Sequence, residues 1–175
     1  MADIFTDIRK LAGDKTKSVA WYQRKIRDLG NRVSARRLIN QGALRRQPSN
    51  GKLNMFFYDP KLKNILPYYD RFPLVLPIDK AKGGFLGLNF HYLPIPLRVR
   101  LLEIIDKKGV NSSYSDLKKI NLIKPTIKHY LTNHLRSGFL RVDQEDFLVA
   151  SLLPVQQFRK ASSARVWRDS RGMVS

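Results

Sequence analysis

Apolar residues recur at helical spacing along the first third of the chain. The pattern predicts three short amphipathic helices, over residues 3–12, 18–29 and 34–41. Ser18 is a favourable N-cap for the second helix, and Gly30 supplies its C-terminal stop. The basic residues of these helices fall mostly outside the apolar stripes, so we expect them on the surface.

The pattern changes to short strand-like runs between residues 52 and 93. We predict strands over 53–58, 65–69, 72–78 and 84–91. The pair Gly83-Gly84 suits a tight hairpin connection, and the prolines of this stretch confine some runs to edges or bends. Nine of the eighteen Phe, Trp and Tyr residues lie here. We therefore expect a small, strongly bent antiparallel sheet or barrel over about 53–92.

Helical spacing returns after residue 94. We predict helices over 96–107, 114–120, 125–137 and 144–152, with a short strand over 139–142. Three helices followed by a strand resemble a winged-helix unit, a nucleic-acid-binding fold. The third helix, however, lacks the cluster of base-reading side chains that a recognition helix carries.

The fold class predicted from these elements is α+β, a bent antiparallel sheet flanked by helices. The chain divides into a basic helical N-terminal arm (1–51), an α+β core (52–150) and a basic C-terminal arm (151–175). Within the core we distinguish a β segment (52–93) from a helical segment (94–150). We expect both arms to extend onto neighbouring subunits of a large assembly.

The net charge of the chain indicates what kind of partner it binds. The chain has 33 Lys and Arg against 14 Asp and Glu, a net charge of +19. Residues 1–51 hold twelve basic and four acidic groups, and residues 151–175 hold five and one. Such a surplus predicts contact with a polyanion, double-stranded DNA first and an acidic protein surface second. The alternative is a solvated basic surface.

Many of the basic residues come as doublets, a spacing that suits backbone phosphates and carries no base-reading code. The polyanion-binding residues that we predict are Arg24, Lys25, Arg36, Arg37, Arg45, Arg46, Arg159, Lys160, Arg165 and Arg168. A tryptophan is unusual in a basic, serine-rich tail. We therefore predict contacts with a protein partner at Trp21, Val166 and Trp167.

The sequence contains no pattern that demands catalysis. It has no cysteine, its three histidines lack metal-ligand spacing, and no phosphate-binding glycine loop is present. Asp59, Asp70 and Asp79 are the residues on which a magnesium-dependent nuclease would depend, but turn roles suit them better. We predict no catalytic or metal site, no cofactor, no small-molecule substrate and no membrane contact.

Several runs of residues resemble a family of small virion proteins of T-even-like contractile-tailed phages, often labelled DNA end protector proteins. The resemblance covers most of the chain. It lies in Trp21-Tyr22 with the basic helix that follows, Asn54–Pro60, Leu66–Pro77, Gly83–Leu93, Leu122–Lys128, Leu153–Phe158 and Val166–Arg171. It implies a non-enzymatic structural protein of the virion, assembled in the host cytoplasm, near packaged DNA at the neck or tail. It implies no catalytic residue.

Three functions stay open on the sequence alone. The first is a virion structural protein that contacts packaged DNA and neighbouring subunits in a symmetric assembly. The second is a tail or baseplate assembly protein whose charge meets acidic subunits without DNA. The third is a DNA-processing nuclease.

Overall fold

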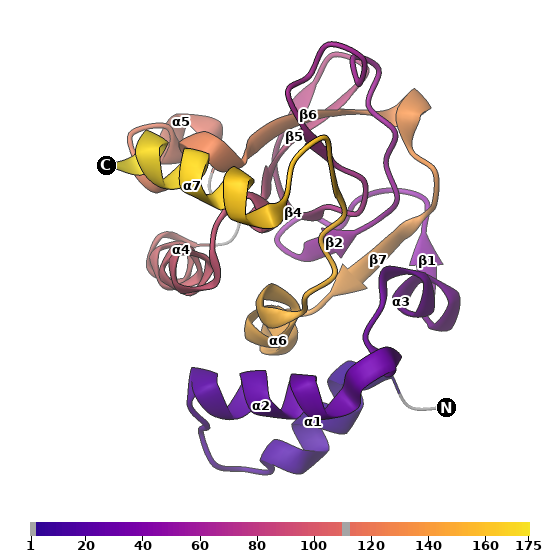
Figure 1. Cartoon of the computed structure of the whole chain (residues 1–175), viewed down its shortest axis with the longest axis vertical. Coiled ribbons are helices and arrows are strands. Elements are labelled where there is room, and N and C mark those ends of the chain that lie inside the picture. The colour runs from indigo at the N-terminus through magenta and orange to yellow at the C-terminus, as the bar shows by residue number, and fades with distance from the viewer. Residues whose placement is uncertain (1–2, 110–112) are drawn as a thin grey trace.

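The computed structural model describes residues 3–109 and 113–175 (Figure 1). Residues 1–2 and 110–112, which belong to the predicted N-terminal arm and helical segment, lie outside the described residues. The α-helices are α1 (Ile4–Ala12), α2 (Val19–Leu29), α3 (Ala35–Gln41), α4 (Ile95–Lys108), α5 (Tyr114–Leu117), α6 (Phe147–Leu152) and α7 (Ser163–Val174). The 3-10 helices are η1 (Gly30–Arg32), η2 (Phe90–Tyr92), η3 (Asn121–Thr126), η4 (Thr132–His134) and η5 (Gln144–Asp146). The strands are β1 (Leu44–Arg45), β2 (Leu53–Met55), β3 (Tyr69–Asp70), β4 (Leu74–Ala81), β5 (Gly84–Asn89), β6 (Ile127–Leu131), β7 (Phe139–Val142) and β8 (Phe158–Arg159).

An antiparallel sheet in the order β1-β7-β2-β4-β5-β6 organises the chain, and β3 pairs with β8 in a separate ribbon. β4 and β5 form the predicted hairpin, in which Gly83 has a positive φ of 77° that glycine adopts without strain. The register between these strands shifts between Pro77 and Asp79. A proline is tolerated inside the sheet at such an irregularity because the ladder is already interrupted there.

The two faces of this sheet carry different cores, because successive side chains of a strand point to opposite faces. One face packs on the buried residues of α4 and α6, and we call it the helical face; its members include Leu53, Met55, Leu74, Leu76 and Leu88. The other carries a separate aromatic cluster, and we call it the loop face; its buried members are Phe56, Tyr58, Val75, Phe85, Tyr130 and Phe139.

The loop face is held together by aromatic ring contacts. The Phe56 ring lies 5.3 Å from the Tyr130 ring and 4.8 Å from the Phe139 ring, in edge-to-face geometry. Gly87 makes the packing possible, since a Cβ there would lie 2.2 Å from Cγ1 of Val75. The aromatic β segment of the sequence therefore contributes to a second small core.

The N-terminal segment is helical, as predicted, but it is not an extended arm. Ser18 caps α2 by accepting a hydrogen bond from the backbone N–H of Trp21. Ile4, Phe5 and Ile8 of α1 are buried in the same core as α6. The segment packs on its own chain because these apolar stripes need a cover.

The C-terminal segment, predicted as an extended basic arm, also packs on its own chain. Its residues Ser163–Val174 form α7, which packs against η2 and η3 of the same chain. Val166, predicted to contact a partner, is 0% exposed inside its own protein. Trp167 donates a hydrogen bond from Nε1 to the carbonyl of His91 at 2.8 Å. Tryptophan in this basic tail therefore anchors the tail to its own core.

The predicted helix over 125–137 is wrong. This stretch contains the end of η3, then β6 and η4. β6 pairs with β5 along Gly84–Leu88, and this tertiary pairing outweighs the helical spacing of the apolar residues. The winged-helix interpretation fails with that helix, since the order of three helices and a strand is absent.

The predicted barrel is not confirmed either, because the sheet is open. Three of its strands, β1, β6 and β7, come from outside residues 53–92. The predicted strand over 65–69 is mostly turns, and only Tyr69 and Asp70 form β3. The α+β class and the antiparallel pairing are confirmed.

Candidate nucleic-acid interface

The predicted polyanion-binding residues lie on elements that are distributed around the molecule. Arg24 and Lys25 lie on α2, and Arg165 and Arg168 lie on α7. Figure 1 places these two helices on different sides of the sheet, with α2 below it and α7 to the left. The structure therefore does not bring the predicted cations together into one site.

Four of the predicted cations do form one neighbourhood, on α3 and the edge strand β1. Arg36 and Arg37 lie on the exposed surface of α3, and Arg45 and Arg46 follow at β1. Their side chains make no hydrogen bond or ion pair with any residue that the structure describes. Their charges are therefore available to a ligand.

Two other predicted cations already have partners within the chain. Lys160 adopts a positive φ of 71° and donates from Nζ to the carbonyls of Lys63 at 2.5 Å and Leu66 at 2.8 Å. It thereby fixes the loop over residues 60–66. The Lys25 ammonium lies 5.6 Å from the Trp21 ring, a cation–π distance. Trp21 itself is half-buried and packs edge-on against Tyr22.

Arg159 belongs to a cluster that the sequence did not reveal. It lines a hollow of about 480 Å³ together with Lys63, Arg71 and Arg136, and we call this the basic hollow. Its one carboxylate, Asp59, pairs with Lys63 at 3.1 Å and Arg136 at 3.5 Å. The hydrogen bond from Lys63 lowers the pKa of Asp59, which therefore stays ionised. Positive charge exceeds negative charge in this hollow.

Chain topology creates the basic hollow. β3 pairs with β8, and this pairing places Arg71 beside the segment that carries Arg159. An isolated bridge between Tyr58 and Leu135 brings Arg136 to the same place. These residues are far apart in the sequence, so no local pattern joins them.

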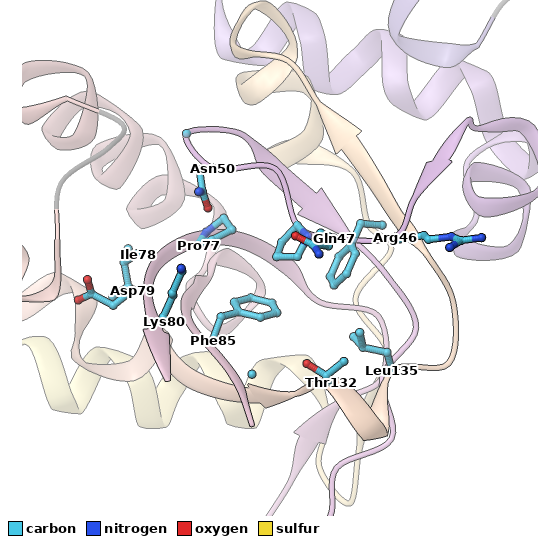
Figure 2. A pocket seen from close by; sticks show the side chains of 14 residues that line it. Arg46, Gln47, Asn50, Pro77, Ile78, Asp79, Lys80, Phe85, Thr132 and Leu135 are labelled. Carbon is cyan, nitrogen blue, oxygen red and sulfur yellow. The ribbon is translucent and has the colours of Figure 1, made fainter. Parts of the chain in front are cut away.

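A larger cavity, of about 690 Å³, lies beside the basic hollow on the loop face (Figure 2). Phe85 and Phe139 of the aromatic cluster line it, together with polar residues of the loop before β2. In Figure 2, Gln47 and Lys80 lie on either side of the Phe85 ring, whereas the Arg46 guanidinium extends away from the cavity. The cavity therefore has an apolar floor and a polar rim that includes both Lys80 and Asp79.

The basic hollow and the larger cavity are lined by consecutive residues of the chain. Leu135 lines the cavity with Arg46, and the next residue, Arg136, lines the hollow with Arg71. Gly138 lies against the backbone of Arg45, since a Cβ there would be 3.0 Å from its carbonyl oxygen. We call this surface the cationic face and define it by five arginines: Arg45, Arg46, Arg71, Arg136 and Arg159.

The three aspartates of the nuclease hypothesis have separate roles. Asp70 is buried and accepts hydrogen bonds from the backbone N–H groups of Phe72 and Gln157 and from the side chains of Asn89 and His91. Burial opposes ionisation, but the interaction with His91 and these hydrogen bonds hold the pKa of Asp70 below its ordinary value. Asp79 accepts from the backbone N–H of Tyr114 at 2.7 Å. The described residues contain no group of three His, Asp or Glu side chains placed to bind a metal ion.

The described part of the chain contains no helix long and apolar enough to cross a bilayer. The family model described as phage T4 terminal DNA protecting protein matches residues 6–170. That range includes nearly all of the helices and the whole sheet. No curated protein and no solved structure matches the chain.

Proposed function

Because the chain belongs to the family of phage T4 terminal DNA protecting proteins, we propose that it binds the ends of linear double-stranded DNA and shields them. The family match carries the proposal, and four arginines of the cationic face that lack ion-pair partners among the described residues support it. In this proposal the protein is a non-enzymatic component of the virion, near the packaged genome at the neck or tail. Neighbouring virion proteins surround it there in a symmetric assembly.

The cationic face binds the DNA backbone. Arg45, Arg46, Arg71 and Arg159 lack ion-pair partners among the described residues, so each can neutralise a phosphate without first breaking a contact. Guanidinium groups bind phosphate oxygens in bidentate geometry. Because these contacts are to phosphates, binding is independent of base sequence and weakens with salt.

Discrimination of an end from the interior of a duplex needs a contact that only an end offers. The face of the terminal base pair is such a surface, because it is apolar and unstacked. The loop over 60–66 exposes two apolar side chains, Leu62 at 53% and Ile65 at 76%. Apolar side chains pack against base pairs in many DNA complexes. Lys160 fixes this loop through two carbonyls, so the apolar tip is held in place beside the basic hollow.

A competition experiment tests end binding. Protection of a labelled linear duplex from an exonuclease is measured against unlabelled fragments of different length at equal total base pairs. We expect competition to follow the number of ends, so that short fragments compete best and closed circles compete least. Competition that follows total base pairs would contradict end binding.

Matched variants locate the interface. Arg71→Gln with Arg159→Gln removes two unpaired charges from the cationic face, and Arg24→Gln with Arg168→Gln removes two from α2 and α7. We expect the first pair to weaken protection about tenfold or more, and the second to leave it nearly unchanged. Ile65→Ser should lower the preference for ends while binding to the duplex interior persists.

A second candidate function rests on the cations outside the cationic face. Arg24, Arg165 and Arg168 are exposed on α2 and α7, away from the basic hollow. They suit acidic surfaces of neighbouring proteins in a tail or baseplate assembly. Co-purification of the wild type with tail fractions, lost on substitution of these three residues, would favour this function.

A further inference from the structure

A third cavity, of about 340 Å³, lies beneath the loop over 60–66, and we call it the tyrosine cavity. The apolar loop residues Pro60, Leu62 and Leu66 form part of its wall. Five tyrosines also line it: Tyr68 and Tyr69 are half-buried, and Tyr58, Tyr92 and Tyr130 are buried. Two lysines line it, Lys61 on the exposed loop and Lys128 of β6 on the sheet side.

Lys128 is unusual because its charge is uncompensated. Its Nζ lies 3.9 Å from the centre of the Tyr92 ring, and its side chain makes no hydrogen bond or ion pair with any described residue. Burial lowers the pKa of Lys128 to about 8, so the amine is still mostly protonated at pH 7. A partly desolvated ammonium without an anion is unfavourable, and an arriving anion would relieve it.

The acidic residue that lines the cavity does not neutralise Lys128. Asp70 already accepts four hydrogen bonds, from Phe72, Gln157, Asn89 and His91. The Tyr58 hydroxyl accepts a hydrogen bond from the backbone N–H of Leu131 at 2.8 Å, and its own proton is free to be donated. The cavity therefore offers a partly buried cation at Lys128, a hydroxyl donor and aromatic rings to a ligand, with the exposed Lys61 at its loop side.

We propose that the tyrosine cavity holds the terminal nucleotide of a DNA strand, with its base among the tyrosines and its terminal phosphate at Lys128. This inference rests on the proposed function, because it names what the protein recognises at a DNA end. Aromatic side chains bind bases without sequence preference. The volume is at the small end of ligand sites and suits one nucleotide. Leu62 both lines the cavity and is exposed at the loop tip, so a strand end at the tip lies beside the cavity.

Binding of a single nucleotide tests the cavity directly. The probes are thymidine 5′-monophosphate, thymidine 3′-monophosphate and thymidine, and the measurement is isothermal titration calorimetry with the full chain. We expect at least one monophosphate to bind about tenfold or more tightly than thymidine, because a charge-assisted contact with Lys128 is added. The preferred monophosphate reports which strand terminus the cavity takes.

Lys128→Met should abolish the preference for phosphate and leave thymidine binding nearly unchanged. Lys124→Met is the matched control, because Lys124 is exposed on η3 and lines none of the cavities described above. If Lys128→Met does not fold, Lys128→Arg keeps the charge and should retain a preference for the monophosphate. Equal binding of thymidine and both monophosphates by the wild type would overturn the inference.

DNA probes separate this inference from the proposed function. A DNA hairpin with one open end is prepared with a 5′-phosphate, a 3′-phosphate or hydroxyl groups only. A phosphorylated end that is protected better than the hydroxyl end, with the difference lost in Lys128→Met, supports the inference. Equal protection of all three ends overturns the inference and leaves end binding intact. Monophosphate binding at Lys128 without any protection of DNA ends overturns the proposed function instead.

Discussion

The helical face and the loop face of the sheet differ in what covers them. The helical face packs on α4 and α6 through aliphatic side chains, and its buried residues belong to one large core. The loop face has a small aromatic core covered by loops, and cavities lined by cations open around it. Stability is therefore concentrated on one side of the sheet and ligand contact on the other. Substitutions that separate these two properties test the division.

The largest expected effect falls on Asp70, which connects the loop cover to the sheet. It accepts hydrogen bonds from Gln157 before β8, from Asn89 at the end of β5 and from His91 in η2. Asp70→Ala leaves these buried donors unpaired, and we expect a loss of about 3–5 kcal/mol in the free energy of unfolding. Denaturation in urea measures it. Asp70→Asn, which keeps the shape and one acceptor oxygen, should cost clearly less, and equal costs would contradict the role of the hydrogen bonds.

The same carboxylate predicts a pH dependence. The pKa of Asp70 in the folded protein lies below its ordinary value of 3.8. Its contribution to stability is therefore complete above that value and is lost as the pH falls through the folded pKa. The wild type should lose this part of its stability in acid, and Asp70→Asn should not. A parallel decline in both proteins would assign the acid sensitivity to other groups.

A pair of core substitutions compares the two faces next. Phe56 lies at the centre of the aromatic cluster, and Leu101 is buried under the helical face on α4. We expect Phe56→Ala to cost about 3–5 kcal/mol and Leu101→Ala about 2–5 kcal/mol, since both leave cavities. At a temperature where circular dichroism shows both variants folded, only Phe56→Ala should weaken DNA-end protection. Equal weakening would show that global stability, and not the loop face, limits binding.

Local patterns predicted the elements that local chemistry determines. Ser18 caps α2 and Gly30 ends it, as the sequence indicated. The hairpin at Gly83 was equally local. Strand β6 is not determined locally. The apolar residues of 127–131 have the spacing of a helix, and pairing with the edge of β5 makes this segment a strand. The prediction of extended basic arms was wrong for a related reason. A basic composition does not reveal whether the apolar stripe of a helix is buried against the same chain.

The candidate interface was predictable only in part. Arg45, Arg46 and Arg159 were among the predicted cations, because doublets are visible in the sequence. Arg71 and Arg136 are single basic residues, and the pairings β3–β8 and Tyr58–Leu135 bring them to the others. The sequence did not indicate Lys128 as a site residue, because its burial and its lack of an anionic partner are properties of the fold.

The smallest expected effect concerns the boundary of the cationic face. Arg45 lies on the edge strand β1, at the rim of this surface, and Arg168 lies on α7 outside it. If Arg45 contacts one phosphate, Arg45→Gln should reduce the slope of log affinity against log salt by about 0.9, with no change in base preference. Arg168→Gln removes the same charge and should leave the slope unchanged. Filter binding to a linear duplex over a salt series measures both slopes, and an equal reduction in both would mean that net charge alone attracts the DNA.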